Sequence, residues 1–234
     1  VTPMMENDDI DYQSLESLID WHIEQGTNGI VSVGTTGESA TLDVKDHLDV
    51  VKYTIDYANS RIPIIAGTGA NSTSEAIELT EESKKLGADY TLIVTPYYNK
   101  PNQNGLIKHY LKLADNVDIP QILYNVPSRT ACDLSPESVK LLSEHKNIIG
   151  IKEAVNTEDR MSDLLDISKD NDDFILLSGD DPSFLSMMQK GGDGVISVAA
   201  NVVPNTISNI CALIYEGKTE EAININQKLC DLYE

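Results

Sequence analysis

Asn147-Ile148-Ile149-Gly150-Ile151-Lys152-Glu153-Ala154 is the stretch from which the fold can be worked out. The run from Ile148 to Ile151 is small or apolar throughout, which predicts a short strand buried on both faces, and Lys152 stands where that strand ends. Parallel sheets carry their chemistry at the carboxyl ends of the strands, so Lys152 is expected to point into a pocket. Partial loss of hydration would make this amine a nucleophile for carbonyl compounds. The same pattern also fits a lysine that is simply solvated at a strand end, so the rest of the chain must decide.

Apolar runs of strand length alternate with amphipathic segments of helical length on both sides of this stretch. The predicted strands are 29–33, 62–66, 90–95, 121–124, 148–151, 174–178 and 195–198, and Val1-Thr2-Pro3 is predicted to be the end of one more. The predicted helices are 12–25, 44–57, 74–86, 106–114, 136–144, 159–168, 182–189 and 204–215. Eight strands, each followed by a helix, predict an α/β fold with a parallel sheet, and at this count a (β/α)8 TIM barrel. A doubly wound open sheet is the alternative.

Both ends of the chain are predicted to lie inside incomplete elements. The first strand would be truncated at Val1, and 220–234 predicts a helix that stops without a cap. The expected organisation is therefore a barrel over 1–216 and the start of a C-terminal helical region over 217–234, most of which is lacking. No composition shift or low-complexity tract marks a further boundary.

The chain is strongly acidic. Its 38 Asp and Glu residues against 17 Lys and Arg give a formal net charge of −21, a field that repels phosphate backbones and anionic lipid. This argues against a nucleic-acid partner or a membrane-surface role, and no apolar run approaches the ~20 residues of a membrane span. The three cysteines are widely spaced without a CxxC pair, which predicts reduced thiols in a cytoplasmic protein. We expect no metal, because Asp180-Asp181 finds no suitable partner at a neighbouring strand end except Glu153.

Polar side chains that follow different predicted strands would meet at one rim of the barrel. Lys152 is the candidate nucleophile, and Tyr124, on the adjacent strand, could shuttle protons for it. Thr35 and Thr36 offer hydroxyls and backbone amides in a glycine-flanked turn, enough to bind a small carboxylate. Arg129 could hold a second carboxylate through two hydrogen bonds. Plainer interpretations also exist. Tyr124 could be an ordinary core tyrosine, Thr35 and Thr36 could belong to an ordinary turn, and Arg129 could form a surface ion pair.

The sequence resembles the pyruvate-dependent class I aldolase and lyase superfamily, and within it the dihydrodipicolinate synthase family, along its whole length. The motifs that carry the resemblance are Val1-Thr2-Pro3-Met4, Gly34-Thr35-Thr36-Gly37-Glu38-Ser39, Val94-Thr95-Pro96-Tyr97-Tyr98-Asn99, Tyr124-Asn125-Val126-Pro127-Ser128-Arg129-Thr130, Gly150-Ile151-Lys152-Glu153-Ala154 and Ser178-Gly179-Asp180-Asp181. Together they are highly specific.

The resemblance implies a reaction and a set of roles. Lys152 would form an imine with pyruvate, so that no cofactor is needed, and the pyruvate carboxylate would lie at Thr36 and near Ile196. Tyr124, Thr35 and Tyr98 would form a proton relay, with Tyr98 reaching into a partner subunit's site. The remaining substrate-binding residues would be Gly179 and Arg129, the latter holding the carboxylate of L-aspartate-4-semialdehyde on the route to lysine and diaminopimelate.

The resemblance also implies an assembly and a regulator. Members are usually homotetramers built as a dimer of dimers, and many are inhibited by L-lysine in a cleft between subunits. The positions that match this cleft are Ser39, Ala40, His47, Asn71, Glu75 and Tyr97. Val44 departs from the histidine that some regulated members have there.

Two other functions remain open at the level of sequence. The first is a different pyruvate-dependent aldolase, such as a sialic-acid or keto-deoxy-sugar-acid lyase, and Arg129 favours the synthase over these because they usually lack it. The second is a non-catalytic barrel that binds a keto acid. Chemical trapping of pyruvate on Lys152 would separate the second from any aldolase.

Overall fold

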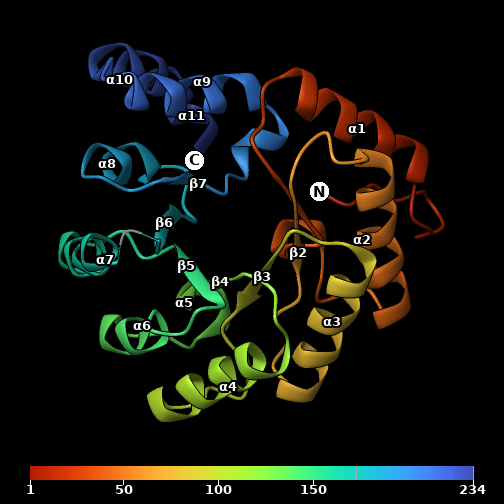
Figure 1. Ribbon diagram of the computed structural model, residues 1–234. Helices are drawn as coiled ribbons and strands as arrows, with labels where there is room; N and C mark the ends of the chain where they lie inside the picture. Colours follow the sequence, from red (N-terminus) through yellow and green to blue (C-terminus); the bar gives the residue numbers. More distant parts are fainter. Residues whose placement is uncertain (172, 234) are drawn as a thin grey trace.

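The computed structural model describes residues 1–171 and 173–233. Seven parallel strands form a single sheet in which each strand lies beside its neighbour in sequence. They are β1 (Ile30–Ser32), β2 (Ile64–Gly67), β3 (Tyr90–Val94), β4 (Gln121–Asn125), β5 (Ile148–Glu153), β6 (Ile175–Ser178) and β7 (Gly194–Val195). Figure 1 shows the helices as a ring around these strands, which is the TIM-barrel-like α/β arrangement. The strictly sequential strand order excludes the doubly wound alternative, in which the order reverses at a switch point.

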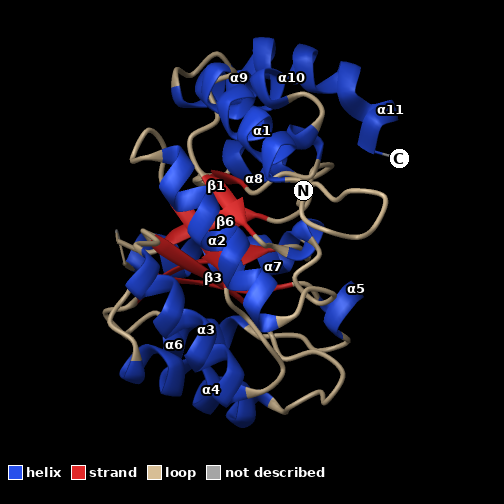
Figure 2. Ribbon diagram, turned by 90° about the vertical axis from the view of Figure 1, so that its right-hand side faces the viewer, coloured by secondary structure: helices blue, strands red, loops and turns tan. Residues whose placement is uncertain are grey.

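The helices cover the outer face of the sheet, and Figure 2 shows the strands enclosed by them. They are α1 (Tyr12–Glu24), α2 (Val44–Ala58), α3 (Thr73–Leu86), α4 (Gln103–Asn116), α5 (Pro127–Thr130), α6 (Pro136–Leu142), α7 (Glu158–Asp170), α8 (Phe184–Gln189), α9 (Pro204–Tyr215), α10 (Thr219–Asn226) and α11 (Cys230–Tyr233). Side-chain caps fix where several begin: Asp43, Ser72 and Asn102 each accept a backbone N–H from the first turn.

Successive residues of a strand point to opposite faces, and here both faces are apolar. Leu92 and Ile122 belong to the cluster inside the barrel, whereas Ile93 and Leu123 pack with the helices outside it. Burial on both faces explains why the strands appear in the sequence as continuous apolar runs rather than as alternating ones.

Three predictions about element boundaries need correction. Val1–Pro3 form no strand, and near this end Met4 and Ile10 make an isolated antiparallel bridge. The described residues therefore form seven sheet strands where eight were predicted. The strand predicted at 195–198 ends at Val195, and the chain then turns through the 3-10 helix Ala199–Asn201 because Asp181 accepts two of its backbone N–H groups. β5 runs through Lys152 to Glu153, so the lysine lies within the strand.

The helix predicted at 220–234 is divided. α10 is followed by the 3-10 helix Gln227–Leu229 and then by α11, and residue 234 lies outside the described residues.

The ring of helices is closed between α9 and α1 although β1 and β7 are not paired among the described residues. Ser208 Oγ donates to Gly26 O at 2.6 Å, and Asn205 Nδ2 donates to Gln25 O at 3.3 Å. Residues of both β1 and β7 line one cavity inside the barrel.

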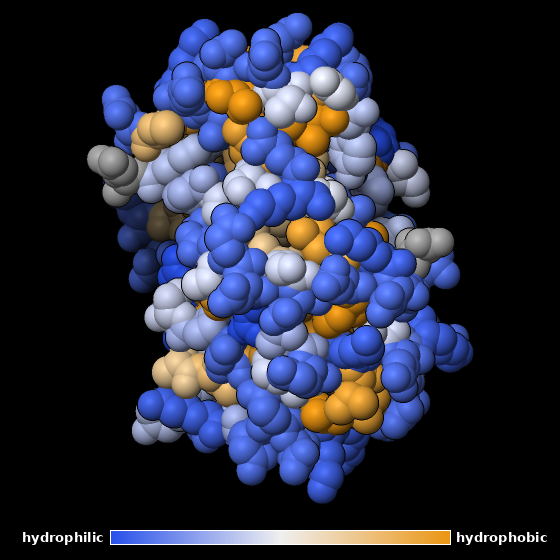
Figure 3. All heavy atoms as spheres, turned by 90° about the vertical axis from the view of Figure 1, so that its left-hand side faces the viewer, coloured by the Kyte–Doolittle hydropathy of each residue, from blue (hydrophilic) through white to orange (hydrophobic). Residues whose placement is uncertain are grey.

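The surface is predominantly polar, as the net charge requires. Figure 3 shows the face that includes the α6–α8 side as mostly hydrophilic, with small separate hydrophobic areas. In the described part of the chain, no helix combines the length and the apolar composition that crossing a bilayer requires.

Candidate active site

Lys152 and Tyr124 face each other across neighbouring strands inside the barrel. The register of β4 and β5 pairs Tyr124 with Lys152. Both side chains are buried, at 5% and 8% exposed respectively, and Lys152 Nζ lies 4.0 Å from the centroid of the Tyr124 ring. The structure thus brings together the predicted nucleophile and the predicted proton shuttle.

Burial lowers the pKa of Lys152 to about 8, with a further lowering by the charge of Arg129 and an opposing effect from Asp181. The cause is loss of hydration, which disfavours the charged ammonium. With this pKa, about one molecule in ten carries the free amine at pH 7, a few hundred times the fraction of an ordinary lysine. The side chain is therefore a usable nucleophile near neutrality.

Gly179 makes the space that Lys152 occupies. A Cβ atom at this position would stand 2.9 Å from Lys152 Cε, 3.1 Å from Lys152 Cγ and 3.3 Å from Ala154 Cβ. The backbone N–H of Gly179 also donates to Glu153 O at 2.7 Å, which fixes β6 against β5 at this level. Gly179 thus lies beside the buried Lys152 side chain, where its lack of a side chain is required.

Tyr124 keeps its proton at neutral pH. Burial raises its pKa, while a polar contact with Thr35 and the charge of Arg129 act in the opposite direction. A neutral phenol can both donate and accept, and the contact with Thr35 links it to the turn after β1. Three of the predicted residues, Lys152, Tyr124 and Thr35, are therefore contiguous.

The turn after β1 is held in a strained conformation. Val33 has φ +53°, which is rare for a β-branched residue, and it directly precedes Gly34 and the 3-10 helix Thr35–Gly37. Gly67 lies against it, since a Cβ there would come within 2.2 Å of Val33 O. Strain at such a position is typical of functional turns, and it directs Thr35 and Thr36, both exposed, toward the rim.

The segment after β7 completes the rim. Ile196 N donates to Ser178 O at 2.9 Å, and Asp181 Oδ2 accepts from the backbone N–H groups of Val198 and Ala199 at 2.9 Å each. Asp181 therefore acts as a local cap for the turn after β7. Among the described residues, no group of three or more His, Cys, Asp and Glu side chains could hold a metal ion.

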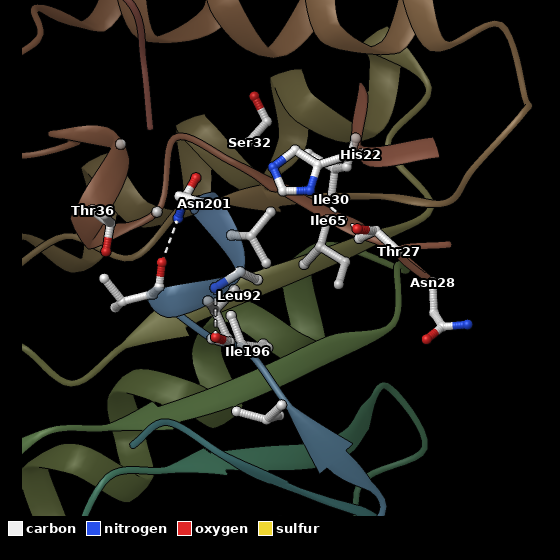
Figure 4. A pocket seen from close by; sticks show the side chains of 18 of the residues that line it. His22, Thr27, Asn28, Ile30, Ser32, Thr36, Ile65, Leu92, Ile196 and Asn201 are labelled. Atoms are coloured by element: carbon white, nitrogen blue, oxygen red, sulfur yellow. Dashed lines mark hydrogen bonds between the residues drawn. The ribbon is translucent and has the colours of Figure 1, made fainter. Parts of the chain in front are cut away.

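A cavity of about 520 Å³ runs from this rim into the barrel. Figure 4 shows Thr36 and Asn201 toward one end of it and His22, Thr27 and Asn28 toward the other. Ile30 and Ile65 lie between them, so the middle of the cavity is apolar. Lys152 and Ile196 are also in its lining. The rim end offers hydroxyls and an amine to a small polar ligand.

Arg129 lies on α5, directly after β4, and is exposed. Its charge affects both Tyr124 and Lys152. Arg61 pairs with Asp20, and Arg160 pairs with Asp133 and Glu153. Of the arginines in the described residues, Arg129 is the one without a carboxylate within 4.0 Å, so it is available for an anionic ligand.

Tyr98 is not brought into this group. It is 89% exposed and has φ +71°, so the loop presents its ring to the outside of the chain. Nearby, Asn99 Nδ2 donates to Asn71 O at 3.2 Å. Burial raises the pKa of Tyr97, and the charge of Glu75 raises it further. The structure thus places Asn71, Glu75 and Tyr97 in one region.

The other positions matched to the lysine cleft differ in exposure. Ala40 is exposed and Ser39 half-buried, whereas His47 is only 4% exposed. The His47 ring is hydrogen-bonded through Nε2 to Gly67 O at 2.8 Å. Since Gly67 packs against Val33, His47 helps to hold the residue that supports the strained turn.

Sequence reasoning missed a buried polar cluster behind the reactive pair. Asn125, Glu153 and Arg160 interact on the outer face of β4 and β5, and only Glu153 had been considered, as a remote metal partner. The sequence contained a signal for it: Asn125 and Glu153 each follow a candidate site residue in a strand, so they must point to the opposite face.

The model of the Dihydrodipicolinate synthetase family matches residues 1–234. A 4-hydroxy-tetrahydrodipicolinate synthase of Stutzerimonas stutzeri is 53% identical over 233 residues, which cover 100% of this chain and 79% of that protein. A dihydrodipicolinate synthase of Acinetobacter baumannii, described as chloride-inhibited and complexed with pyruvate, superposes with a TM-score of 0.96 at 51% identity, covering 100% of this chain and 79% of the other. A lysine-bound synthase of Cyanidioschyzon merolae superposes with a TM-score of 0.95 at 38% identity, covering 100% of this chain and 79% of the other.

Proposed function

The chain belongs to the dihydrodipicolinate synthetase family, and we propose that it condenses pyruvate with L-aspartate-4-semialdehyde as a 4-hydroxy-tetrahydrodipicolinate synthase, a lyase of lysine and diaminopimelate biosynthesis. The single observation that carries this proposal is the buried amine of Lys152, with Nζ 4.0 Å from the centre of the Tyr124 ring. A buried amine beside a proton-shuttling phenol can form an imine with a small keto acid.

In the first stage, the free amine of Lys152 attacks the keto carbon of pyruvate, and the pyruvate oxygen leaves as water to give an imine. The phenol of Tyr124 supplies and takes back the protons, and Thr35 connects it to the rim. The hydroxyl of Thr36 and the backbone around Ile196 hold the pyruvate carboxylate. Loss of a methyl proton then gives an enamine, with the protonated nitrogen of Lys152 as electron sink, so the reaction requires no cofactor and no metal.

In the second stage, the enamine carbon attacks the aldehyde carbon of the semialdehyde. Arg129 holds the carboxylate of this second substrate. It is available for this role because no carboxylate among the described residues lies within 4.0 Å of it, whereas Arg61 and Arg160 are paired. The amino group of the same substrate then attacks the imine carbon, closes the ring and releases Lys152. The room that Gly179 leaves beside the lysine permits these changes of geometry.

The exposed ring of Tyr98 suits a role in a second subunit. We assign it to the proton relay of a partner's site within a homotetramer built as a dimer of dimers. The region of Asn71, Glu75 and Tyr97, together with Ser39, Ala40 and His47, would bind L-lysine as an inhibitor. The three free cysteines accord with a cytoplasmic location.

A coupled assay with pyruvate and L-aspartate-4-semialdehyde tests the function. Turnover by the wild-type chain and none by Lys152→Ala supports it. Arg129→Ala is expected to raise KM for the semialdehyde while KM for pyruvate changes little. Turnover of a sialic acid or a keto-deoxy-sugar acid that Arg129→Ala leaves intact would instead assign the chain to another aldolase activity.

A further inference from the structure

A cluster of buried polar and charged side chains lies directly behind the reactive pair, on the opposite face of the same strands. Asn125 of β4 and Glu153 of β5 are 0% and 1% exposed, and Arg160 of α7 is 7% exposed. Burying charged groups is unfavourable unless they are well paired, and the reaction described above gives these residues no part. Their presence at this point therefore requires another explanation.

The cluster joins β4 to β5. Asn125 Nδ2 donates to Glu153 Oε1 at 3.0 Å and to Oε2 at 3.1 Å. These two residues are paired in the sheet, one position after the pair of Tyr124 and Lys152. Side chains alternate between faces, so this bond outside the barrel adjoins the 4.0 Å contact inside it.

The register of these two strands needs fixing at this end. At the start of β4, Gln121 pairs with Ile148 and Ile122 pairs with Gly150, so the register between β4 and β5 shifts by one residue between Gln121 and Ile122. A slip of one residue would turn a whole set of side chains to the wrong face. Because the beginning of β4 does not fix the register, the bond between Asn125 and Glu153 can do so where the chemistry lies.

The same cluster anchors the segment that carries Arg129. Asn125 Oδ1 accepts from Leu134 N at 3.0 Å, and Arg160 Nη1 donates to Leu134 O at 2.9 Å. Arg160 also pairs with Asp133 and, through Nε at 3.4 Å, with Glu153 Oε2. Segment 126–134, which includes α5, is thus tied at both ends to the strands that hold Lys152 and Tyr124.

We propose that Asn125, Glu153 and Arg160 are positioning residues for the condensation. The bond between Asn125 and Glu153 holds Tyr124 opposite Lys152, and Arg160 holds the segment from which Arg129 reaches the second substrate. The kinetic consequences rest on the proposed function, whereas the effect on Lys152 itself does not.

Competitive labelling of lysines with acetic anhydride, followed by mass spectrometry, measures the apparent pKa of Lys152 without any substrate. The pKa of Lys152 is affected by the charges of Arg129 and Asp181, and the Glu153→Gln variant keeps both of these groups. Removal of a negative charge alone can only lower the pKa of a nearby amine. We expect a rise, since a looser strand pair lets water reach the amine; an unchanged or lowered pKa in folded protein overturns the proposal.

Asp193→Asn is the matched control. Asp193 Oδ2 accepts from Leu176 N at 2.7 Å, near the start of β6 and away from the reactive pair. This variant also weakens a carboxylate contact between strand and loop, but we expect it to leave the Lys152 pKa unchanged. An equal rise in both variants would mean that any loss of stability moves this pKa, and would overturn the specific role of the cluster.

Steady-state kinetics test the two parts separately. Glu153→Gln is expected to lower kcat about tenfold. Arg160→Lys, which keeps the charge and serves if Glu153→Gln does not fold, is expected to raise KM for the semialdehyde by about fivefold or more and leave KM for pyruvate within about twofold. Equal changes in both KM values, or none, contradict the assignment. If the wild-type chain does not condense the two substrates, the proposed function fails. The labelling experiment uses no substrate, so it still tests whether the cluster positions Lys152.

Discussion

Gly179→Ala tests whether the space beside Lys152 sets the reactivity of the amine. The new Cβ would stand 2.9 Å from Lys152 Cε, whereas ordinary contacts begin at 3.4 Å, so the lysine must withdraw by about 0.5 Å. Because the atom that moves belongs to a flexible side chain, the loss of stability is expected to be small, about 1 kcal/mol. Displacement of a reacting group by ~1 Å lowers rates about a hundredfold, so we expect trapping of pyruvate at Lys152 to be slowed about tenfold.

The assay is the rate of adduct formation with pyruvate and borohydride, normalised to folded protein. Gly29→Ala is the matched control, since its Cβ would find Pro63 O at 3.7 Å and Ile65 Cδ1 at 3.9 Å, both ordinary contacts. If Gly179→Ala reacts as fast as wild type while remaining equally stable, the lysine is not confined as described.

Three further outcomes are expected. Trapping at Lys152 should rise with pH and level off above its pKa of about 8, and a rate that still rises tenfold per unit between pH 9 and 10 would show an ordinary lysine. Because the folded-state pKa is lowered from 10.5, the unfolded chain binds more protons between pH 8 and 10.5, so stability rises with pH in that window. Lys152→Met should therefore be more stable than wild type at pH 7, by up to about 3 kcal/mol in urea unfolding, with a smaller gain at pH 9.5; a gain that grows with pH contradicts this. Tyr124→Phe should slow trapping at least about tenfold and leave the KM for pyruvate nearly unchanged, whereas unchanged turnover would remove Tyr124 from the proton relay.

Much of the barrel was predictable because its strands are buried on both faces. The largely apolar runs at 90–94 and 148–151 are too short to be amphipathic helices, and capping residues such as Asp43 and Ser72 mark where helices begin. Strand order then followed from the regular alternation of elements.

The details of the rim could not be predicted from local patterns. By its sequence, Val33 is one more strand residue, yet it has φ +53° and packs against Gly67, whose carbonyl oxygen is hydrogen-bonded to the His47 ring. The strand predicted to continue past Val195 ends there because Asp181, distant in sequence, caps the following turn. Both effects depend on tertiary contacts, which local propensity does not contain.

The residues of the site were predictable as a set of strand ends, but not the distances among them. Lys152 and Tyr124 meet because β4 and β5 pair in one particular register, and this register shifts near Gln121. The sequence showed Asn125 and Glu153 beside the reactive residues without showing that they bond to each other. Tyr98 was expected in a relay, and the chain alone leaves it exposed.

The most direct measurement is mass-spectrometric mapping of the adduct formed with pyruvate and borohydride. The account predicts a single modified peptide that contains Lys152, formed readily at pH 8 and absent from Lys152→Met. Folded protein that forms no adduct, or one whose adducts are spread over the exposed lysines, would contradict the claim that a buried and partly dehydrated amine performs the chemistry.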